Sequence, residues 1–220
     1  MDILILSPLY NLPYFKETDP AVVHDFIKSN PFALLTGATP AGSPVATQLP
    51  MFLEDEDSRQ FLRGHMMRNT DHHKVMAVND QVLVVFTGPH CYVSATWYSD
   101  PHQASTWNYM SVHVKGRIRF TSPQSLLKIL EKTTMYFENM NSESSTVLHN
   151  LTEEYVNRLL PAIVPFEIEI DSIENVFKLS QNRDRESYLN IIAQLEKGDH
   201  NQNEIAKAMA ERFEDLYREV

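Results

Sequence analysis

Alternating apolar and polar residues recur over much of the chain and predict a series of β-strands. In the clearest example, segment 166–171, apolar residues at 166, 168 and 170 alternate with acidic residues at 167, 169 and 171. Successive side chains of a strand point to opposite faces, so this segment predicts a half-exposed strand. The other strands are expected at residues 32–36, 45–53, 60–66, 81–87, 90–98 and 107–120, with the breaker Gly88-Pro89 before the fifth of these.

Apolar residues spaced three and four positions apart predict helices at the start, the middle and the end of the chain. Asp19 and Pro20 suit the N-cap and first position of the first helix, which should stop at Asn30-Pro31. The remaining helices are expected at residues 71–76, 123–137, 150–160, 186–197 and 203–217. Together these elements favour an α+β, mainly antiparallel barrel with peripheral helices. The expected domains are a main domain over residues 1–198 and a C-terminal helical appendage over residues 199–220.

Composition narrows the class of protein. The chain has 220 residues, of which 43% are hydrophobic, and a formal net charge of −10. That charge disfavours attraction to phosphate polymers, so nucleic acid is not the expected partner. The single cysteine, Cys91, cannot form an internal disulfide, which fits a reducing compartment. Because the apolar run from Ile3 to Leu6 is too short for a membrane span, we expect a soluble, cytoplasmic protein.

The first candidate for ligand binding is the segment from Gly64 to Thr70, which leaves a strand and enters a helix. Free backbone N–H groups at such a junction, with the side chains of His65, Arg68 and Asn69 nearby, would form a cradle for an anion. The plain alternative is that Arg68 is solvated and that Asn69 or Thr70 only caps the helix.

A second group of candidates combines indole rings with hydroxyl groups. Ser94 and Thr96 are expected on one strand face, about 7 Å apart, where both hydroxyls could meet a phosphate or a polyol chain. Trp97 and Trp107 offer planar surfaces with ring N–H donors. The alternative is that both indoles belong to the core and that the hydroxyls merely decorate an exposed strand face.

A third group is the polar cluster from Phe177 to Arg183. Lys178 and Gln181 place an ammonium and an amide group at the end of a strand, where surface decoration is the alternative. Together with the two indoles, this cluster suits a flat aromatic ligand that carries an anionic tail.

Motifs of metal sites and hydrolases are absent from the sequence. His72 and His73 are adjacent and point about 100° apart on a helix, and no H-x-x-x-H, C-x-x-C or G-x-S-x-G pattern occurs. We therefore expect no metal, and no residue stands out as a general acid or base.

The last two helices superficially suit a helix-turn-helix, but their acidic residues outnumber the basic ones, so we interpret them as a packing or dimer-forming appendage.

The candidate segments belong to a longer series of short motifs. The series consists of Leu9-Tyr10, Phe15, Asn30-Pro31-Phe32, Thr47-Gln48-Leu49-Pro50, Gly64-His65 with Asn69, Gly88-Pro89-His90, 93–98, 106–109, Phe166-Glu167-Ile168 and 177–183. In this order the motifs resemble those of the PaiB-like family, which are FMN-binding negative transcriptional regulators with a pyridoxamine-phosphate-oxidase-like split barrel. The resemblance covers nearly the whole chain up to about Leu195.

The resemblance implies a homodimer of split barrels with FMN in clefts at the subunit interface. It places the phosphate near the segment 65–69 and the two hydroxyls, and the ring system near the two indoles, within reach of Lys178 and Gln181. The residues expected to bind FMN are His65, Arg68, Asn69, Ser94, Thr96, Trp97, Thr106, Trp107, Asn108, Lys178 and Gln181.

Some positions depart from the family pattern. Gln48 stands where the family often has His, and Ala95 and Ser105 stand where it often has Pro. Asn175-Val176 replaces a common Gly-Lys pair, and the resemblance implies that losing this Lys weakens a charge contact to the flavin.

Three functions beyond FMN binding stay open at this point. The first is an FMN-dependent oxidoreductase that acts on a small molecule, since flavin supplies its own redox chemistry. The second is the regulatory role implied by the resemblance, with DNA or a protein as partner. The third is haem handling, with His90 or His113 as ligand.

Overall fold

The computed structural model describes residues 12–218 of the chain. The expectations for Ile3 to Leu6 and for the motif Leu9-Tyr10 lie outside these residues.

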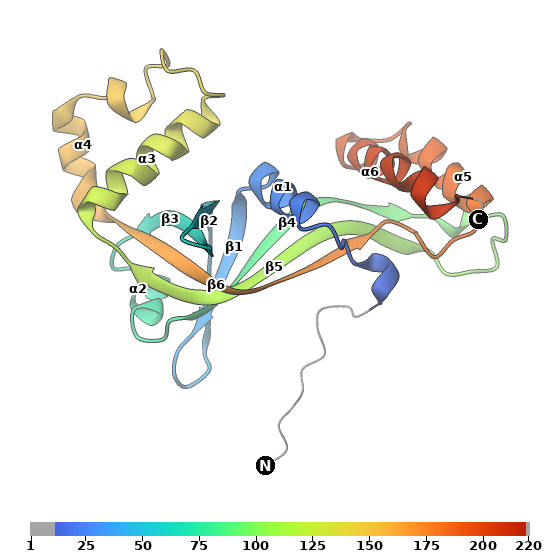
Figure 1. Cartoon of the computed structure of the whole chain (residues 1–220), viewed down its shortest axis with the longest axis horizontal. Helices are drawn as coiled ribbons and strands as arrows, with labels where there is room; N and C mark the ends of the chain where they lie inside the picture. Colours follow the sequence, from blue (N-terminus) through green and yellow to red (C-terminus); the bar gives the residue numbers. More distant parts are fainter. Residues whose placement is uncertain (1–11, 219–220) are drawn as a thin grey trace. The chain divides into compact units, whose positions relative to one another are not determined.

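Six strands form one closed sheet (Figure 1). They are β1 (Phe32–Ala38), β2 (Pro44–Glu56), β3 (Arg59–Met67), β4 (Gln81–Val93), β5 (Thr106–Phe120) and β6 (Ile163–Lys178). Their order around the barrel is β1-β2-β3-β6-β5-β4, and the pairs β1–β2, β1–β4, β2–β3 and β3–β6 are antiparallel. The predicted antiparallel barrel is confirmed.

The helices lie close to their predicted positions. They are α1 (Pro20–Ser29), α2 (Asp71–Met76), α3 (Pro123–Phe137), α4 (Glu153–Leu159), α5 (Arg185–Leu195) and α6 (His200–Leu216). Short 3-10 turns occur at η1 (Pro13–Phe15), η2 (Ala95–Trp97), η3 (Leu148–Asn150) and η4 (Leu160–Ala162).

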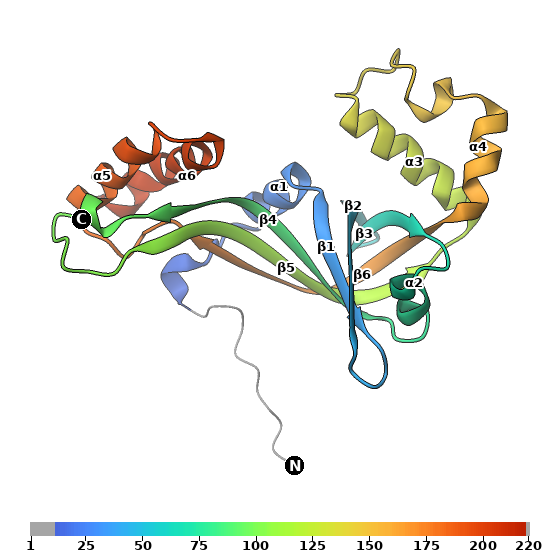
Figure 2. The same ribbon diagram turned by 180° about the vertical axis from the view of Figure 1, so that it is seen from behind.

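Contacts divide the chain into two compact units. Unit 1 comprises Met1–Phe26, Thr87–Val112 and Glu174–Val220, and unit 2 comprises Ile27–Phe86 and His113–Ile173. In unit 1, α5 and α6 lie along one side of the strand ends, as Figures 1 and 2 show. The buried side chains there include Tyr188, Met209 and Cys91, and burial raises the pKa of the Cys91 thiol to about 11.

Unit 2 holds most of the barrel, and two glycines let its backbones approach closely. Gly64 on β3 pairs with Met51 on β2 and with Phe166 on β6. A Cβ atom at residue 64 would lie 2.8 Å from both the Phe166 ring and the Pro50 carbonyl oxygen. At Gly116 on β5, a Cβ atom would overlap the carbonyl oxygen of Glu169. These positions have no room for a side chain.

The prediction that Gly88-Pro89 separates two strands is wrong, because β4 runs through both residues. The part of β4 that pairs with β1 ends at Val85, so the missing N–H group of Pro89 breaks no bond to β1. A Cβ atom at Gly88 would lie 2.5 Å from the ring of Phe26, so glycine is needed here for close packing.

Ser94 and Thr96 do not lie on a strand face, so the expected spacing of about 7 Å is also wrong. β4 ends at Val93, and the Ser94 hydroxyl accepts a hydrogen bond from the Thr96 backbone N–H group. A local side-chain bond to the backbone competes with strand pairing, and here it forms the turn η2. The two hydroxyl oxygens lie 2.8 Å apart.

Glu167 was expected on an exposed face of its strand but is only 6% exposed. Its carboxylate accepts from Arg63 at 3.3 Å and from Arg119. Since two guanidinium groups replace the solvation that the carboxylate loses, burial is tolerated here.

The predicted start of a helix near Asn150 is displaced. Thr152 caps α4 by accepting from the Tyr155 N–H group. Asn150 instead donates to the carbonyl oxygens of Ser142 and Ser144.

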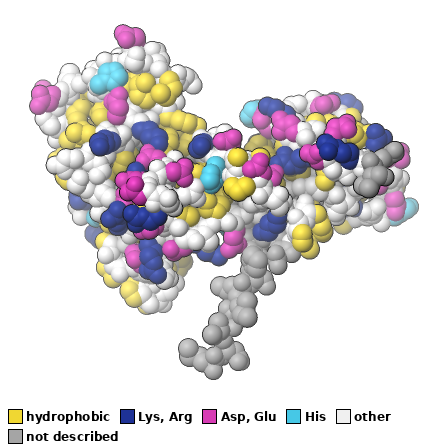
Figure 3. All heavy atoms as spheres, viewed as in Figure 1, with side chains coloured by type: hydrophobic (Ala, Val, Ile, Leu, Met, Phe, Trp, Pro, Cys, Tyr) yellow, Lys and Arg dark blue, Asp and Glu magenta, His cyan; other side chains and the backbone are white. Residues whose placement is uncertain are grey.

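Among residues 12–218, no helix combines the length and the apolar character that crossing a membrane requires. Figure 3 shows Lys and Arg interspersed with Asp and Glu over the face that it presents.

Close backbone approach at Gly116 leads to a first prediction. Gly116→Ala should lower the free energy of unfolding by about 3 kcal/mol, because the methyl group meets backbone atoms that cannot move aside. Urea denaturation measures this loss. Gly37→Ala is the matched control, since a Cβ there meets the flexible Met76 side chain at 3.2 Å and the nearest backbone atom, the Gln81 carbonyl oxygen, at an ordinary 3.9 Å. Equal losses for the two variants would contradict the explanation.

Candidate functional site

A cavity of about 310 Å³ lies in unit 2 where β2, β3 and the start of α2 meet. We call it the His65 cavity. Its lining residues are Thr47, Gln48, Leu49, Pro50, His65, Met66, Met67, Thr70, His72 and Ile163. Two of the motifs found in the sequence, 47–50 and Gly64-His65, therefore lie side by side in space.

His65 reaches this cavity because of its position on β3. The neighbouring Gly64 and Met66 are buried, so alternation along the strand directs His65 to the opposite face. Its Nδ1 atom is buried and has no hydrogen-bond partner among the described residues. Burial also lowers the pKa of this imidazole below its ordinary value of 6.5. A buried, neutral ring nitrogen without a partner is a group that a ligand can satisfy.

The backbone near His65 is less open than the sequence suggested. The N–H group of Arg68 donates to the carbonyl oxygen of Ala162, and that of Asn69 donates to His73 Nδ1. The Arg68 guanidinium donates to the carbonyl oxygens of Pro161 and Ile163, at 3.2 and 3.0 Å. The N–H groups of Arg68 and Asn69 therefore do not form the expected cradle of free donors.

Two cations, Arg68 and Lys74, lie in the segment 68–74, part of which lines the His65 cavity. Burial and the charges of Arg68, His72 and Lys74 lower the pKa of His73. The carboxylate of Asp71 lies beside His72, and their atoms Oδ1 and Nδ1 are 3.1 Å apart. In a chain with a net charge of −10, this basic segment is a local exception.

The remaining predicted residues lie in unit 1, where separate segments meet. Lys178 donates to the hydroxyl of Thr106, and the Ser180 hydroxyl donates to Asn108 Oδ1 at 3.0 Å. Asn108 is fully buried, and its amide nitrogen lies 3.5 Å from the sulfur of Met209. The segments 106–109 and 177–183 are thus adjacent, but Asn108 holds them together and is not open to a ligand.

Gln181 also acts within the protein. Its amide donates to the carbonyl oxygen of Phe177 and accepts from the N–H group of Leu179 at 2.7 Å, which braces the turn after β6. Lys178 is half-buried, and burial together with the charge of Arg183 lowers the pKa of its ammonium.

The two indoles differ in exposure. Trp97 is half-buried at η2, whereas Trp107 is 53% exposed on β5. The Trp107 ring lies 6.1 Å from that of Tyr92 and 6.3 Å from that of His90. We call these three residues the aromatic face of unit 1.

Sequence reasoning overlooked a further contact between motifs. The guanidinium of Arg183 lies 4.2 Å above the ring of Tyr98, and its NH1 group donates to Gln103. The Tyr98 hydroxyl and the Arg183 Nε atom are buried without partners among the described residues. The sequence also gave no role in the cavity to His72 or to Gln48, although Gln48 stood in a quoted motif. Thr70 was part of the candidate segment from Gly64 to Thr70, and it both caps α2 and lines the cavity.

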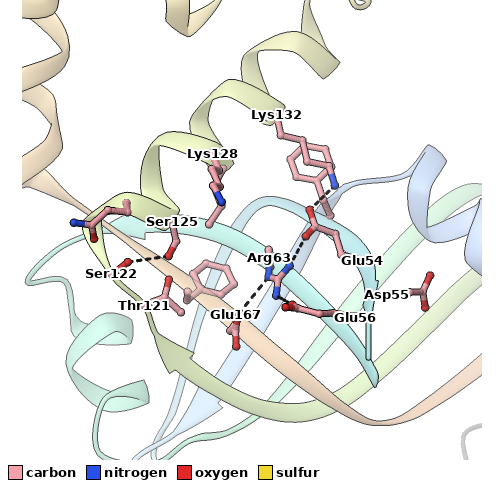
Figure 4. Close-up of a pocket in the computed structure, with 14 residues that line it drawn as sticks. Glu54, Asp55, Glu56, Arg63, Thr121, Ser122, Ser125, Lys128, Lys132 and Glu167 are labelled. Carbon is pink, nitrogen blue, oxygen red and sulfur yellow. Dashed lines mark hydrogen bonds and ion pairs between the residues drawn. The ribbon is translucent and has the colours of Figure 1, made fainter. Parts of the chain in front are cut away.

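Unit 2 contains a second cavity, of about 460 Å³, between α3 and the strands β2, β3 and β6. We call it the α3 cavity, and Figure 4 shows it. Arg63 donates there to Glu54 at 2.6 Å, to Glu167 at 3.3 Å and to Glu56, while Lys132 binds the other oxygen of Glu54 at 2.6 Å. None of the residues expected to bind FMN lines this cavity.

Among residues 12–218, no group of three or more His, Cys, Asp or Glu side chains is arranged to hold a metal ion.

Solved structures define the class of the fold. The chain is similar to the FAD and heme binding protein of Mycobacterium smegmatis, with a TM-score of 0.55 and 16% identity over 74% of this chain and 73% of that one. It is also similar to the flavocytochrome Anf3 of Azotobacter vinelandii, with a TM-score of 0.53 and 15% identity over 77% and 72% of the two chains. The fold is a split barrel.

Sequence comparisons define the family. The family described as "Putative FMN-binding domain" matches residues 9–172. The protease synthase and sporulation protein PAI 2 of Bacillus subtilis is 32% identical over 207 residues, which cover 94% of this chain and 97% of that protein. The chain belongs to the PaiB-like family of FMN-binding proteins, and its cofactor is FMN.

Burial of His65 leads to a second prediction. In an NMR titration its imidazole should have a midpoint below 6.5, whereas that of His149, which bonds to Glu131, should lie above 6.5. Because the unfolded chain then takes up a proton more readily than the folded one, His65 should reduce stability as the pH falls through this range. A His65 midpoint at or above that of His149 would contradict the prediction.

Proposed function

We propose that the His65 cavity receives the phosphate end of FMN. The observation that supports this most strongly is the buried Nδ1 atom of His65, which has no partner among the described residues and lines a cavity formed by two family motifs. Thr47, Gln48 and Thr70 add hydroxyl and amide groups along the same cavity. Such groups suit an anion that is fixed by several hydrogen bonds.

Size and charge support the same assignment. A volume of about 310 Å³ is at the lower end of the range for small-molecule pockets, so the cavity suits one end of an elongated nucleotide. The basic segment from Arg68 to Lys74 favours the phosphate electrostatically. When bound, FMN supplies redox chemistry, and the protein contributes position and electrostatics.

For unit 1 by itself, we propose that its residues can contact a flavin ring. Trp107 is exposed enough to stack on a planar ring, and Trp97, Ser94 and Thr96 lie on the turn that follows β4. Lys178 brings positive charge to the place in unit 1 where segments 106–109 and 177–183 meet. Three further residues support this site by holding segments 106–109 and 177–183 in place through hydrogen bonds. They are Thr106, Asn108 and Gln181.

We infer that the chain forms a homodimer in the cytoplasm. The aromatic face of unit 1 supports the dimer, because Tyr92 and Trp107 are 50% and 53% exposed, and exposed aromatic patches are typical of interfaces. A lone, buried cysteine fits a reducing compartment.

A second candidate function is an FMN-dependent oxidoreductase. The FMN cofactor favours it, because flavin supplies its own redox chemistry and the protein contributes position and electrostatics. Stopped-flow reduction of the bound flavin by NADH or NADPH, followed by turnover with an acceptor, tests this function, and an unreactive flavin would eliminate it.

The two structural relatives also motivate a haem test, with His90 and His113 as the candidate ligands. A haem titration that shifts no Soret band would exclude haem handling.

For the regulatory role we infer a protein partner, because the net charge of −10 opposes contact with DNA. A gel-shift assay at low salt should show no complex, and a retarded band would refute this inference.

The phosphate assignment leads to a third prediction. FMN should bind at least about tenfold more tightly than riboflavin, which lacks the phosphate, as measured by flavin fluorescence. His65→Leu should remove much of this difference, whereas His65→Asn should retain more of it, because its amide can replace Nδ1. Equal affinities for the two flavins in the unmodified protein would refute the assignment.

The dimer leads to a fourth prediction. Sedimentation should give twice the chain mass of 25.4 kDa, and Tyr92→Glu should shift the protein toward the monomer, because burying a carboxylate in an interface is costly. Leu216→Glu, a charge introduced at a similarly half-exposed residue of α6, serves as the control. A monomeric wild-type protein would rule out the dimer.

A further inference from the structure

Between β5 and β6 the chain forms a helical segment, residues 123–162, which we call the helical arm. It contains α3, η3, α4 and η4. In Figures 1 and 2, α3 and α4 extend beyond the ends of β5 and β6. Of the 15 residues of α3 only Leu126 and Ile129 are buried, and none of the 7 residues of α4 is buried. The arm therefore packs little of its apolar surface within its own chain.

The helix α4 has an apolar face that its own chain leaves uncovered. Tyr155, Val156 and Leu159 recur at the spacing of one helical face. Tyr155 and Leu159 are 41% and 40% exposed, and Val156 is half-buried. Isolated helices shorter than about 12 residues are marginal in water, because most helical stability comes from packing of the apolar face. A helix as short as α4 therefore needs a further surface to pack on.

A concave apolar surface lies on the same arm. It is a groove of about 690 Å³ along α3, which we call the Leu127 groove. Its apolar lining comes from Leu127, Met135, Met140 and Leu148. Within the described part of the chain, no residue of α4 lines this groove. The arm thus carries both an apolar groove and an uncovered apolar helix.

The exposed apolar area of the arm matches what one copy contributes to a stable dimer. Six large apolar side chains are between 37% and 69% exposed, namely Leu127, Tyr136, Phe137, Met140, Tyr155 and Leu159. With roughly 200 Å² for a large side chain, they expose on the order of 500 Å². Figure 3 shows hydrophobic side chains on this part of the surface. A standard interface buries about 800 Å² per partner, of which about 60% is apolar.

Charge argues against a lipid surface as the occupant. The first turn of α4 carries Glu153 and Glu154, both exposed, in a chain with a net charge of −10. Helices that lie on membranes carry mostly Lys and Arg on their polar face, because many lipid surfaces are anionic. A second copy of the chain covers the groove and the helix at once, since a two-fold axis brings the same two surfaces together twice.

We propose that, in the homodimer, α4 of each copy lies in the Leu127 groove of the other copy. This inference rests on the proposed homodimer and adds a contact surface on unit 2 to the aromatic face of unit 1. The apolar face of α4, with Tyr155 and Leu159, packs against Leu127 and Met135 as a helix in a groove. Each short helix thereby gains the packing that its own chain does not provide.

Charges introduced at the contact test it. Leu127→Glu, in the groove, and Leu159→Glu, on α4, should each raise the dissociation constant of the dimer at least about tenfold, because each buries a carboxylate in apolar surroundings. Sedimentation velocity over a dilution series measures this constant. Val78→Glu is the matched control, since Val78 is 75% exposed and lies outside the arm, and it should leave the constant unchanged. Thermal denaturation checks that each variant is folded.

Cross-linking locates α4 in the groove of the other copy. A Leu127→Cys chain and a Leu159→Cys chain are mixed, equilibrated and treated with a short bismaleimide. Mass spectrometry of the mixture should find peptides joined between residues 127 and 159. A mixture of Leu127→Cys with Val78→Cys should give no cross-link between 127 and 78, and the buried Cys91 should not react.

The outcomes separate this contact from the homodimer itself. A monomeric wild-type protein would overturn both. A dimer that Leu127→Glu and Leu159→Glu leave intact, or a mixture without the 127–159 cross-link, would overturn the contact alone. Binding to vesicles of phosphatidylcholine and phosphatidylglycerol that Leu159→Glu abolishes would also overturn it, because a membrane would then cover the face.

Discussion

The barrel interior has no space for a side chain at residue 64, and much of unit 2 follows from that constraint. Glycine there lets the Phe166 ring pack directly against the backbone of β3, with β2 on the other side. The strand is thereby fixed between its two neighbours. Since side chains alternate along a strand, Arg63 and His65 must both point away from the interior. One of them enters the α3 cavity, and the other enters the His65 cavity.

The electrostatic environment differs between the α3 cavity and the His65 cavity. Around Arg63 each carboxylate has a cation from the same chain, and these ion pairs compensate for the burial of Glu167. At His65, burial lowers the pKa of the imidazole and disfavours its charged form. The first arrangement holds the strands and α3 together, whereas the second leaves the Nδ1 atom of His65 without a partner among the described residues.

Much of the fold could be predicted from the sequence because it depends on local patterns. The alternation of apolar and polar residues located the strands, and N-cap residues such as Thr70 located the starts of helices. Two of the errors in the predicted strands also have local causes. Ser94 bonds to its own backbone and ends a strand that alternation would have extended, and Pro89 is tolerated beyond the β1 pairing. Burial of Glu167 depends on Arg63, about a hundred positions away, and no local pattern contains that information.

The site was less predictable, because residue type does not show which way a side chain points. Asn108 and Gln181 carry groups suited to a ligand, yet both are used to hold segments of unit 1 together. The guanidinium group of Arg68 donates hydrogen bonds to the backbone carbonyl oxygens of Pro161 and Ile163. Thr70 and His72 line the cavity through their place at the start of α2, which only the three-dimensional structure reveals.

The buried Cys91 has a consequence for a protein that carries a redox cofactor. Its thiol is held protonated by its apolar surroundings, and a protonated thiol reacts slowly with oxidants such as hydrogen peroxide. Without an accessible thiolate, two copies cannot become cross-linked through sulfur. The chain can therefore sit beside a group that passes electrons to oxygen and keep its only sulfhydryl intact.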